Sequence, residues 1–133
     1  MSQENVEVVR RAWRAYNDEG IDAAAEYFAD DCVCEDVPDL PDRATYRGRE
    51  GVREREGHFR ETWGDWAWEP VEFTDAGDDV VVVVIAMRAH GRGSGAPVEV
   101  QAAFVYEVRE GRIVRDRAFT SRSQAFEAAG LRE

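Results

Sequence analysis

Asp36 is the side chain of this sequence with the clearest capacity for acid–base chemistry. It stands near the end of a short predicted strand, Cys32–Val37, with Val33, Cys34 and Val37 beside it. If this strand end faces a cavity, the carboxylate is poorly solvated, and a poorly solvated carboxylate is a stronger proton acceptor. The alternative is a fully solvated carboxylate at a loop mouth. Its acidic neighbours there are Asp30, Asp31, Glu35, Asp39 and Asp42.

Metal ligands and nucleophiles are sparse in the sequence. The two histidines, His58 and His90, form no His-x-His or His-x-x-x-His pair, and no Asp-x-Asp-x-Asp-Gly calcium loop occurs. Cys32 and Cys34 are two residues apart, where a disulfide would be strained, so both are expected as reduced thiols. Gly91–Gly95 lies between two predicted strands, which favours a hairpin over a phosphate loop. We expect neither a metal nor a cofactor.

Composition excludes several classes of partner. The 133 residues include 28 acidic and 17 basic side chains, a formal net charge of −11, so nucleic acid is not expected to bind. The longest apolar run, Val80–Met87, is far shorter than the roughly 20 residues of a membrane-spanning helix. The first residues resemble no signal peptide, which predicts a cytoplasmic protein. Because every basic residue is arginine, chemistry based on a lysine amine is excluded.

The helical period comes first along the chain and the strand period follows. This order predicts a single α+β domain over residues 1–133, with helices covering one face of a curved sheet. The predicted helices are Gln3–Asp18, Ala23–Phe28, Gly48–Trp63 and a last one begun by a Ser121/Gln124 capping box. The predicted strands are Cys32–Val37, Trp66–Phe73, Val80–His90, Val98–Arg109 and Arg112–Thr120.

Aromatic side chains on these elements are candidates for ligand contact. Those that point into the space between helices and sheet either form core or line a pocket. Asp116, Tyr16, Tyr106 and Arg88 would supply the few polar groups that orient a ligand, and Glu99 is the expected partner of Arg88. The predicted ligand-binding residues are Trp13, Tyr16, Phe28, Trp63, Arg88, Phe104 and Tyr106.

For the third predicted helix and for the strand that contains Val80–Met87, the sequence also predicts which side chains are buried. In the third helix, Val52, Phe59 and Trp63 are expected to point inward, whereas Glu56 is expected on the solvent side. Val80–Met87 is apolar on both faces of its strand, and no helix is left over to cover the second face. We therefore expect a homodimer through the sheet face, the alternative being a central strand under the short C-terminal helix.

Several segments of the chain resemble the NTF2-like superfamily, and most closely its SnoaL-like domain branch. The segments are Val8–Asn17, Gly20–Asp22, Phe28–Asp31, Glu35–Asp36, Tyr46–Val52 and Gly111–Val114. The resemblance implies a cone-shaped α+β fold with a curved antiparallel or mixed sheet. Three helices from the N-terminal half would pack on its concave face, and a short helix would end the chain.

Within this superfamily the ketosteroid isomerases offer the sharpest comparison. Asp36 falls on the position of their proton-abstracting aspartate, but the positions of their oxyanion donors fall on Ala12 and on Ala102 or Ala103. Since alanine cannot stabilise a developing enolate, ketosteroid isomerisation is not expected.

Two other branches of the superfamily supply further candidates. SnoaL-type cyclases use an acid and a histidine, for which Asp116 and His90 are the candidates by general position. Limonene-epoxide-hydrolase-like chains use an Asp-Arg-Asp arrangement on neighbouring strands. The segment Arg115–Arg117 is superficially similar, but it lacks the Arg-x-Asp spacing of those chains.

Two functions for a small apolar organic ligand remain open. One is an acid–base enzyme of isomerase, cyclase or hydratase/dehydratase type, with Asp36 as base and Asp116 as a second catalytic residue. The other is a non-catalytic ligand-binding or protein-interaction module. An open cavity with a titratable group of shifted pKa would favour the first, and a cone filled by aromatic side chains the second. The acidic composition favours neutral or cationic ligands over polyanions.

Overall fold

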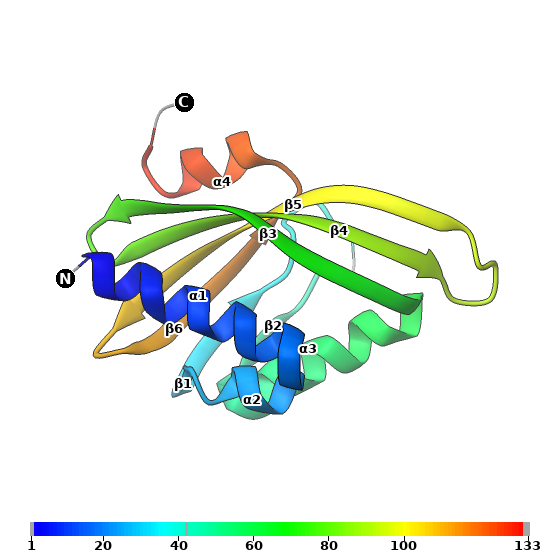
Figure 1. The fold of residues 1–133 in the computed structure, drawn as a ribbon, viewed down its shortest axis with the longest axis horizontal. Helices are drawn as coiled ribbons and strands as arrows, with labels where there is room; N and C mark the ends of the chain where they lie inside the picture. The colour runs from blue at the N-terminus through cyan, green and yellow to red at the C-terminus, as the bar shows by residue number, and fades with distance from the viewer. Residues whose placement is uncertain (1, 42, 132–133) are drawn as a thin grey trace.

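The computed structural model describes residues 2–41 and 43–131 and places three helices against one face of a six-stranded sheet (Figure 1). Along the chain, the elements are α1 (Ser2–Glu19), α2 (Ile21–Ala25), β1 (Phe28–Glu35), β2 (Thr45–Arg47), α3 (Gly48–Thr62), β3 (Trp63–Gly77), β4 (Val80–Gly91), β5 (Pro97–Arg109), β6 (Arg112–Phe119) and α4 (Arg122–Ala128). The α+β class expected from the sequence is confirmed.

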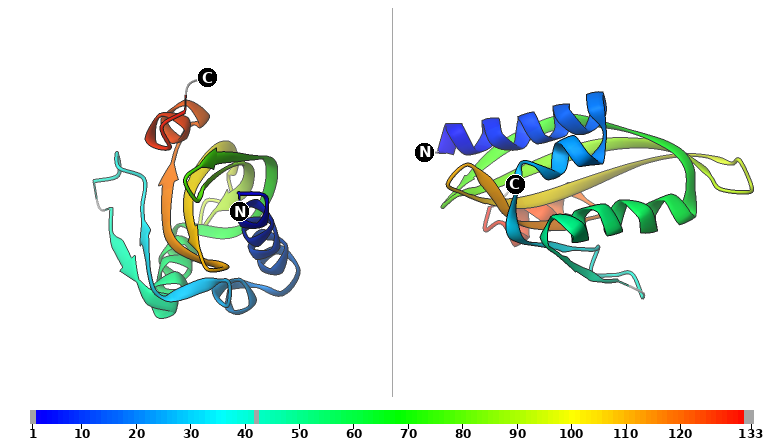
Figure 2. Two further views of the ribbon diagram at one scale, coloured as in Figure 1. Left: turned by 90° about the vertical axis from the view of Figure 1, so that its left-hand side faces the viewer. Right: turned by 90° about the horizontal axis from the view of Figure 1, so that it is seen from below.

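The sheet is mixed and strongly curved. Its strand order is β2-β1-β6-β5-β4-β3, and β1 runs parallel to β6 while every other neighbouring pair is antiparallel. Glu110 and Gly111 join β5 to β6 with φ of 50° and 75°, the positive values that a tight hairpin turn requires. Figure 2 shows the sheet bending around the helices, as the resemblance to the NTF2-like superfamily implied.

The concave face of the sheet and the helices α1, α2 and α3 form the main core. Val6, Val9 and Trp13 recur on α1 at helical spacing, and these side chains meet apolar residues of β1, β4, β5 and β6. Among the described residues, no helix combines the length and the apolar character needed to cross a membrane.

The outer face of the sheet carries a second apolar cluster, which the short helix α4 covers. Because side chains alternate along a strand, Val81 and Val83 face the main core, whereas Val82 and Val84 face outward. The outward cluster is completed by Ala103, Val105, Phe119, Ala125 and Phe126. The premise that no helix is left to cover this face was therefore wrong, and the valine run itself gives no argument for a dimer.

Local boundaries differ from the predicted ones around Phe28. The helix predicted over Ala23–Phe28 ends at Ala25, and Phe28 instead begins β1, where it pairs with Ile113 of β6. Asp36 lies one residue beyond the end of β1, and its backbone N–H donates to the Ala44 carbonyl across the loop. The predicted capping box is half formed: the Ser121 hydroxyl accepts a hydrogen bond from the Gln124 backbone N–H at 3.2 Å, whereas the Gln124 side chain accepts one from the Thr120 hydroxyl at 3.1 Å.

The cover that α4 provides can be tested at Phe126. Phe126 is buried against the outer cluster, and phenylalanine-to-alanine changes in cores cost about 3–5 kcal/mol. We expect Phe126→Ala to lower the free energy of unfolding by about 3 kcal/mol or more, measured by guanidinium denaturation. The exposed Glu127 on the same helix gives a control, and Glu127→Ala should change it by less than about 0.5 kcal/mol. Equal stabilities of the two variants would show that α4 does not hold this face.

Candidate functional site

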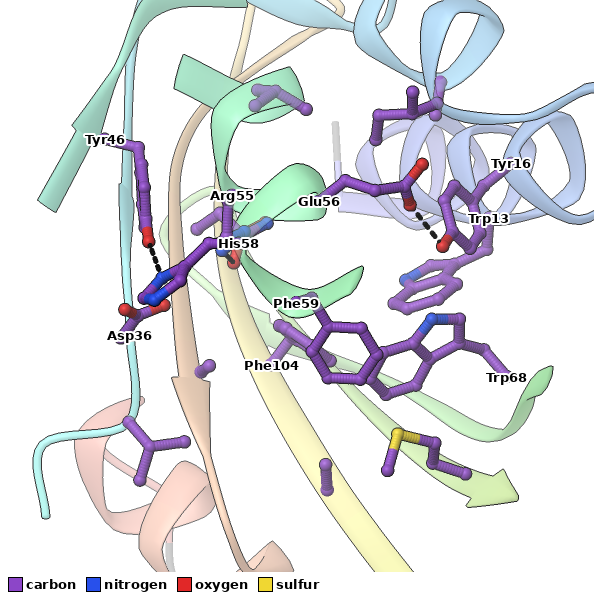
Figure 3. A pocket seen from close by; sticks show the side chains of 18 of the residues that line it. Trp13, Tyr16, Asp36, Tyr46, Arg55, Glu56, His58, Phe59, Trp68 and Phe104 are labelled. Carbon is purple, nitrogen blue, oxygen red and sulfur yellow. Dashed lines mark hydrogen bonds and ion pairs between the residues drawn. The ribbon is translucent and has the colours of Figure 1, made fainter. Parts of the chain in front are cut away.

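A cavity of about 520 Å³ lies between helices α1–α3 and the concave face of the sheet (Figure 3). Ligand pockets of proteins commonly occupy roughly 300–1,000 Å³, so the space suits a small organic molecule. Most lining side chains are apolar or aromatic, and the polar ones are few. The cone is therefore open and is not filled by its aromatic side chains.

Small residues in the wall keep the cavity open. Ala12 and Ala24 line it from the helices, and Ala102 and Ala118 line it from β5 and β6. A methyl group at these positions leaves space that a larger side chain would fill. The cavity is thus a consequence of alanines standing between large aromatic neighbours.

Aromatic rings form one continuous wall of this space. The Trp13 ring centroid lies 5.6 Å from that of Phe104 and 6.0 Å from that of Trp68. Phe59 of α3 adds a contact of 5.3 Å with Trp68, and Phe104 stacks on Tyr106 at 5.9 Å. Such contacts between rings fix their orientations, so the wall offers a rigid apolar surface to a flat ligand.

Tyr16 and Glu56 form a hydrogen-bonded pair at one side of the cavity. The Tyr16 hydroxyl donates to Glu56 Oε1 at 2.5 Å and accepts from the indole N–H of Trp66 at 2.9 Å. Burial, followed by the bond to Glu56, raises the pKa of Tyr16 to about 12. Tyr16 therefore stays protonated at neutral pH, with its proton committed to Glu56.

Arg55 and Asp116 form an ion pair between α3 and β6. Two N–H groups of Arg55 donate to the two carboxylate oxygens of Asp116 at 3.1 and 2.6 Å. Asp116 is 1% exposed, whereas the Arg55 side chain is 21% exposed and lines the cavity. Burial is the largest influence and works to lower the pKa of Arg55, but the charge and hydrogen bonds of Asp116, with smaller contributions from Cys34 and Tyr106, together raise that pKa well above its ordinary value. The guanidinium is a permanent cation in this wall.

Two further polar groups stand near this ion pair. The indole Nε1 of Trp13 is buried, and its N–H faces the Tyr106 hydroxyl. Burial, and then the charge of Asp116, raise the pKa of the Tyr106 hydroxyl well above its ordinary value, while the Trp13 indole N–H opposes that rise. Tyr106 therefore remains a protonated hydroxyl in the cavity wall.

Asp36 lines another part of the cavity, with Tyr46 and His58 (Figure 3). Asp36 is half-buried, and its Oδ2 accepts a hydrogen bond from the Ala44 backbone N–H at 3.0 Å. The Tyr46 hydroxyl lies 2.8 Å from His58 Nδ1, a hydrogen bond whose direction depends on the histidine tautomer. Because His58 is exposed, this cluster reaches the mouth of the cavity.

The structure brings together most of the residues predicted from the sequence to form the site. Trp13, Tyr16, Phe28, Trp63, Phe104 and Tyr106 line the cavity, as do Asp36 and Asp116. Arg88 does not, because it occupies an even-numbered position on β4 and so points outward with Val82 and Val84. It lies opposite Glu99 on β5, the partner expected from the sequence.

His90, the histidine candidate from the cyclase resemblance, also lies outside the cavity. It is exposed near the end of β4, and its Nδ1 lies 2.8 Å from an Asp65 carboxylate oxygen. Of the two histidines, both of which lie in the described part of the chain, His58 is the one that lines the cavity.

The charged residues of α3 were the main omission of the sequence analysis. Glu56 was expected on the solvent side and Arg55 was not considered, yet both line the cavity. They stand three and four residues after the inward-facing Val52, and Phe59 follows at the same spacing. Two charges on an otherwise inward stripe are the signal that could have revealed them, because a helix face repeats every three or four residues.

The cysteines belong to the core behind this site. Cys32 and Cys34 are buried, free thiols on β1, and the hydrogen bond with Cys32, helped by burial, raises the pKa of Cys34 far above its ordinary value. Within residues 2–41 and 43–131, no group of three or more His, Cys, Asp or Glu side chains is placed to hold a metal ion.

Comparison with protein families identifies one match. Residues 9–116 match the family model of the SnoaL-like domain, which covers most of the chain. No curated protein sequence matches this chain.

Solved structures share the fold along nearly the whole chain. TerC, co-crystallised with polyporic acid, superposes with a TM-score of 0.78 at 18% identity over 96% of this chain and 98% of TerC. A putative SnoaL-like polyketide cyclase from Jannaschia sp. CCS1 gives a TM-score of 0.75 at 18% identity, over 98% of this chain and 94% of that protein. An NTF2-like protein from Burkholderia thailandensis E264 superposes with a TM-score of 0.78 at 23% identity. The match covers 96% of this chain and 98% of that protein. At these identities the similarity concerns the fold.

The raised pKa of Tyr16 predicts a pH dependence of stability. The folded-state pKa of about 12 exceeds the ordinary value of 10.0, so the folded state holds a proton that the unfolded state loses. Stability contributed by this group is complete below pH 10 and is lost as the pH rises toward 12. We expect the unfolding free energy to fall more steeply between pH 10 and 12 in the wild type than in Tyr16→Phe, measured by urea denaturation. Parallel curves for the two proteins would refute the assignment.

Proposed function

The chain belongs to the SnoaL-like domain family, and we propose that it binds a small, ring-shaped apolar molecule and transfers a proton on it, with Asp36 as the base. The observation that carries this proposal is the open cavity of about 520 Å³, with an aromatic wall and a few polar groups in separate parts. A filled cone would have favoured a module without a ligand. A rigid aromatic wall favours a flat ring over a flexible chain.

Two solved structures of the same fold support this class of ligand and reaction. TerC was co-crystallised with polyporic acid, and the Jannaschia protein is described as a putative SnoaL-like polyketide cyclase. Their sequences differ too much from this chain to transfer a substrate. Both descriptions agree with a cavity that takes a small organic molecule, and the aromatic wall of this cavity favours a ring-shaped one.

Asp36 is the carboxylate best placed to take a proton from such a ligand. Asp36 lines the cavity, is half-buried and accepts one backbone hydrogen bond, which leaves lone pairs on both oxygens for a ligand. Asp116 is less suited, because Arg55 bonds both of its oxygens and it is 1% exposed. We therefore assign Asp116 a positioning role rather than the second catalytic role expected from the sequence.

The reaction that we propose is not that of a ketosteroid isomerase. Ala12 and Ala102, which fall on the donor positions of those enzymes, line the cavity and offer no hydrogen bond there. Ala103 points to the outer cluster. A substrate whose charge developed at those positions would meet only methyl groups, so the oxygen of the true substrate must lie elsewhere.

Assembly and location complete the proposal. The outer sheet surface carries the exposed Arg88 and Glu99 opposite each other, and a twofold axis would bring Arg88 of one protomer to Glu99 of its partner. We propose a homodimer through this surface. The free thiols Cys32 and Cys34 agree with a cytoplasmic location, where thiols stay reduced.

Proton transfer can be tested without the natural substrate. 2-Tetralone is a bicyclic aromatic ketone with acidic α-hydrogens, and their exchange in D₂O is followed by ¹H NMR. We expect the wild-type protein to accelerate this exchange and Asp36→Asn to lose about 10²–10⁴-fold of the acceleration, because a positioned base contributes that much. Quenching of tryptophan fluorescence by the ketone should be nearly unchanged, since the amide keeps the shape of the side chain.

The control for this experiment is Asp39→Asn. Asp39 is exposed in the same loop and does not line the cavity, so its removal should leave the exchange rate at the wild-type value. A wild-type protein that binds the ketone without accelerating exchange would contradict the acid–base proposal and support a non-catalytic binding module. Equal acceleration by wild type and Asp36→Asn would remove Asp36 from the mechanism.

The dimer is tested by sedimentation. We expect wild-type protein at micromolar concentration to sediment as a dimer, and Arg88→Glu to sediment as a monomer because like charges would then meet across the axis. Monomeric wild-type protein would contradict the proposed interface.

A further inference from the structure

We propose that Glu56 and the aromatic rings around it form a subsite for one ammonium group of the ligand. The inference rests on the proposed function and deepens it, because it predicts that the ring-shaped ligand carries a basic amine at the end away from Asp36. Figure 3 shows Asp36 on one side of the cavity and a cluster on the other that consists of Glu56, Tyr16, Trp13, Phe59 and Trp68.

The Glu56 carboxylate is largely buried and only partly compensated. Its side chain is 14% exposed and lines the cavity. Among the residues that the structure describes, the Tyr16 hydroxyl supplies its one hydrogen bond, at 2.5 Å from Oε1. Arg60 brings Nη2 to 3.6 Å from Oε2, too far for a hydrogen bond, and the Arg60 side chain is 57% exposed, so solvent weakens this ion pair. Oε2 can therefore accept a hydrogen bond from a ligand.

The N–H and O–H groups beside this carboxylate are already in use. The Tyr16 hydroxyl gives its proton to Glu56 and accepts from the Trp66 indole N–H at 2.9 Å. The Trp68 indole N–H faces the same hydroxyl. This side of the cavity thus presents a carboxylate oxygen and ring carbons to a ligand. A carbonyl or an oxyanion would be repelled by the Glu56 charge, whereas an ammonium group would find an acceptor.

The rings around Glu56 also favour a positive charge. The Phe59 ring centroid lies 5.3 Å from that of Trp68 and 4.9 Å from that of Trp66. The Trp13 ring lies 6.0 Å from the rings of Tyr16 and Trp68. Because the face of an aromatic ring is negatively polarised, it attracts a cation within about 6 Å of its centroid. A ligand ammonium group at Glu56 would therefore gain from the rings as well as from the carboxylate.

Arg60 shows that this cluster attracts a cation from its outer side. Its guanidinium carbon lies 4.9 Å from the Trp66 ring centroid, in addition to the contact with Glu56. Arg60 lines a smaller surface pocket of about 240 Å³, which shares Tyr16, Glu56 and Trp68 with the main cavity. A ligand ammonium group would use the same carboxylate from the inside of the cavity.

The remaining charges of the cavity agree with a cationic ligand. Arg55 is the cation of the cavity wall, but Asp116 accepts two hydrogen bonds from it and offsets its charge. The formal net charge of −11 attracts cations to the protein as a whole. The subsite thus narrows the neutral or cationic ligands expected from composition to a ring system with one amine.

The test compares two probes that share one bicyclic skeleton. 2-Aminotetralin carries an ammonium group at neutral pH, whereas 2-tetralol carries an uncharged hydroxyl at the same carbon. We expect isothermal titration calorimetry on the wild-type protein to show at least about tenfold tighter binding of the amine, the size expected for a hydrogen bond between charged groups.

Three variants that each remove one negative charge assign this preference. Glu56→Gln should reduce it to less than about threefold, although the amide oxygen still accepts the hydrogen bond from Tyr16. Glu54→Gln is the matched control, because Glu54 is exposed on the same helix and does not line the cavity, and it should keep the wild-type preference. Asp36→Asn removes the carboxylate on the other side of the cavity and should also keep it.

A fourth variant tests the rings without changing any charge. Phe59→Leu keeps an apolar side chain at this position but removes the aromatic face. We expect it to weaken binding of the amine about threefold more than binding of the alcohol, because a cation at a ring face gains about 0.5–1 kcal/mol or more. Equal losses for the two probes would remove Phe59 from the subsite.

The outcomes separate this inference from the proposed function. Equal binding of both probes by the wild type would overturn the ammonium subsite and leave the ligand-binding cavity intact. A preference that falls equally in Glu56→Gln and Glu54→Gln would be an effect of net charge, and one lost only in Asp36→Asn would place the cation at Asp36; either result would overturn the assignment to Glu56. Failure of the wild type to bind either probe would contradict both proposals. An amine preference in a protein that does not accelerate exchange of 2-tetralone would support the subsite and contradict only the proton transfer.

Discussion

The ion pair of Arg55 with Asp116 is the buried polar contact that ties α3 to the sheet beside the cavity. It joins α3 to β6 across the core, and removing one partner of a buried pair typically costs about 3–5 kcal/mol because a charge is left without compensation. A helix held only by apolar contacts could move inward and close the space. The paired charges link α3 to β6 and give the cavity one polar wall.

The alternation of side chains along β4 and β5 divides the remaining apolar residues between two clusters. Val81 and Val83 pack under α1, whereas Val82 and Val84 pack under α4. A short helix is sufficient for the outer cluster because Phe126 fills it with one large ring, which the Arg122 guanidinium covers at 3.9 Å. The inner face is consequently free to combine large rings with alanines, and that combination forms the cavity.

Most of the fold could be predicted from the sequence, because helical and strand periods are local properties. Three aspects of the structure were missed. Arg88 was assigned to the pocket from its place at the end of an apolar run, although strand alternation directs it outward. Arg55 and Glu56 were missed because a charged side chain on a helix is ordinarily solvated. Only the tertiary fold shows that Arg55 pairs with Asp116 and that Glu56 accepts a hydrogen bond from Tyr16. The packing of α4 on the outer apolar cluster was also missed. It depends on the direction of the chain after β6, which local sequence patterns do not determine.

The central claim is that the open cavity is where a ligand binds, and alanine methyl groups report on it directly. In protein labelled with ¹³C at the alanine methyls, Ala12, Ala102 and Ala118 line the cavity, while Ala103 and Ala125 lie in the outer cluster. Titration with 2-tetralone should shift the NMR signals of the first three and leave the other two in place. Unchanged signals for the three cavity alanines, with shifts confined to Ala103 and Ala125, would contradict the account.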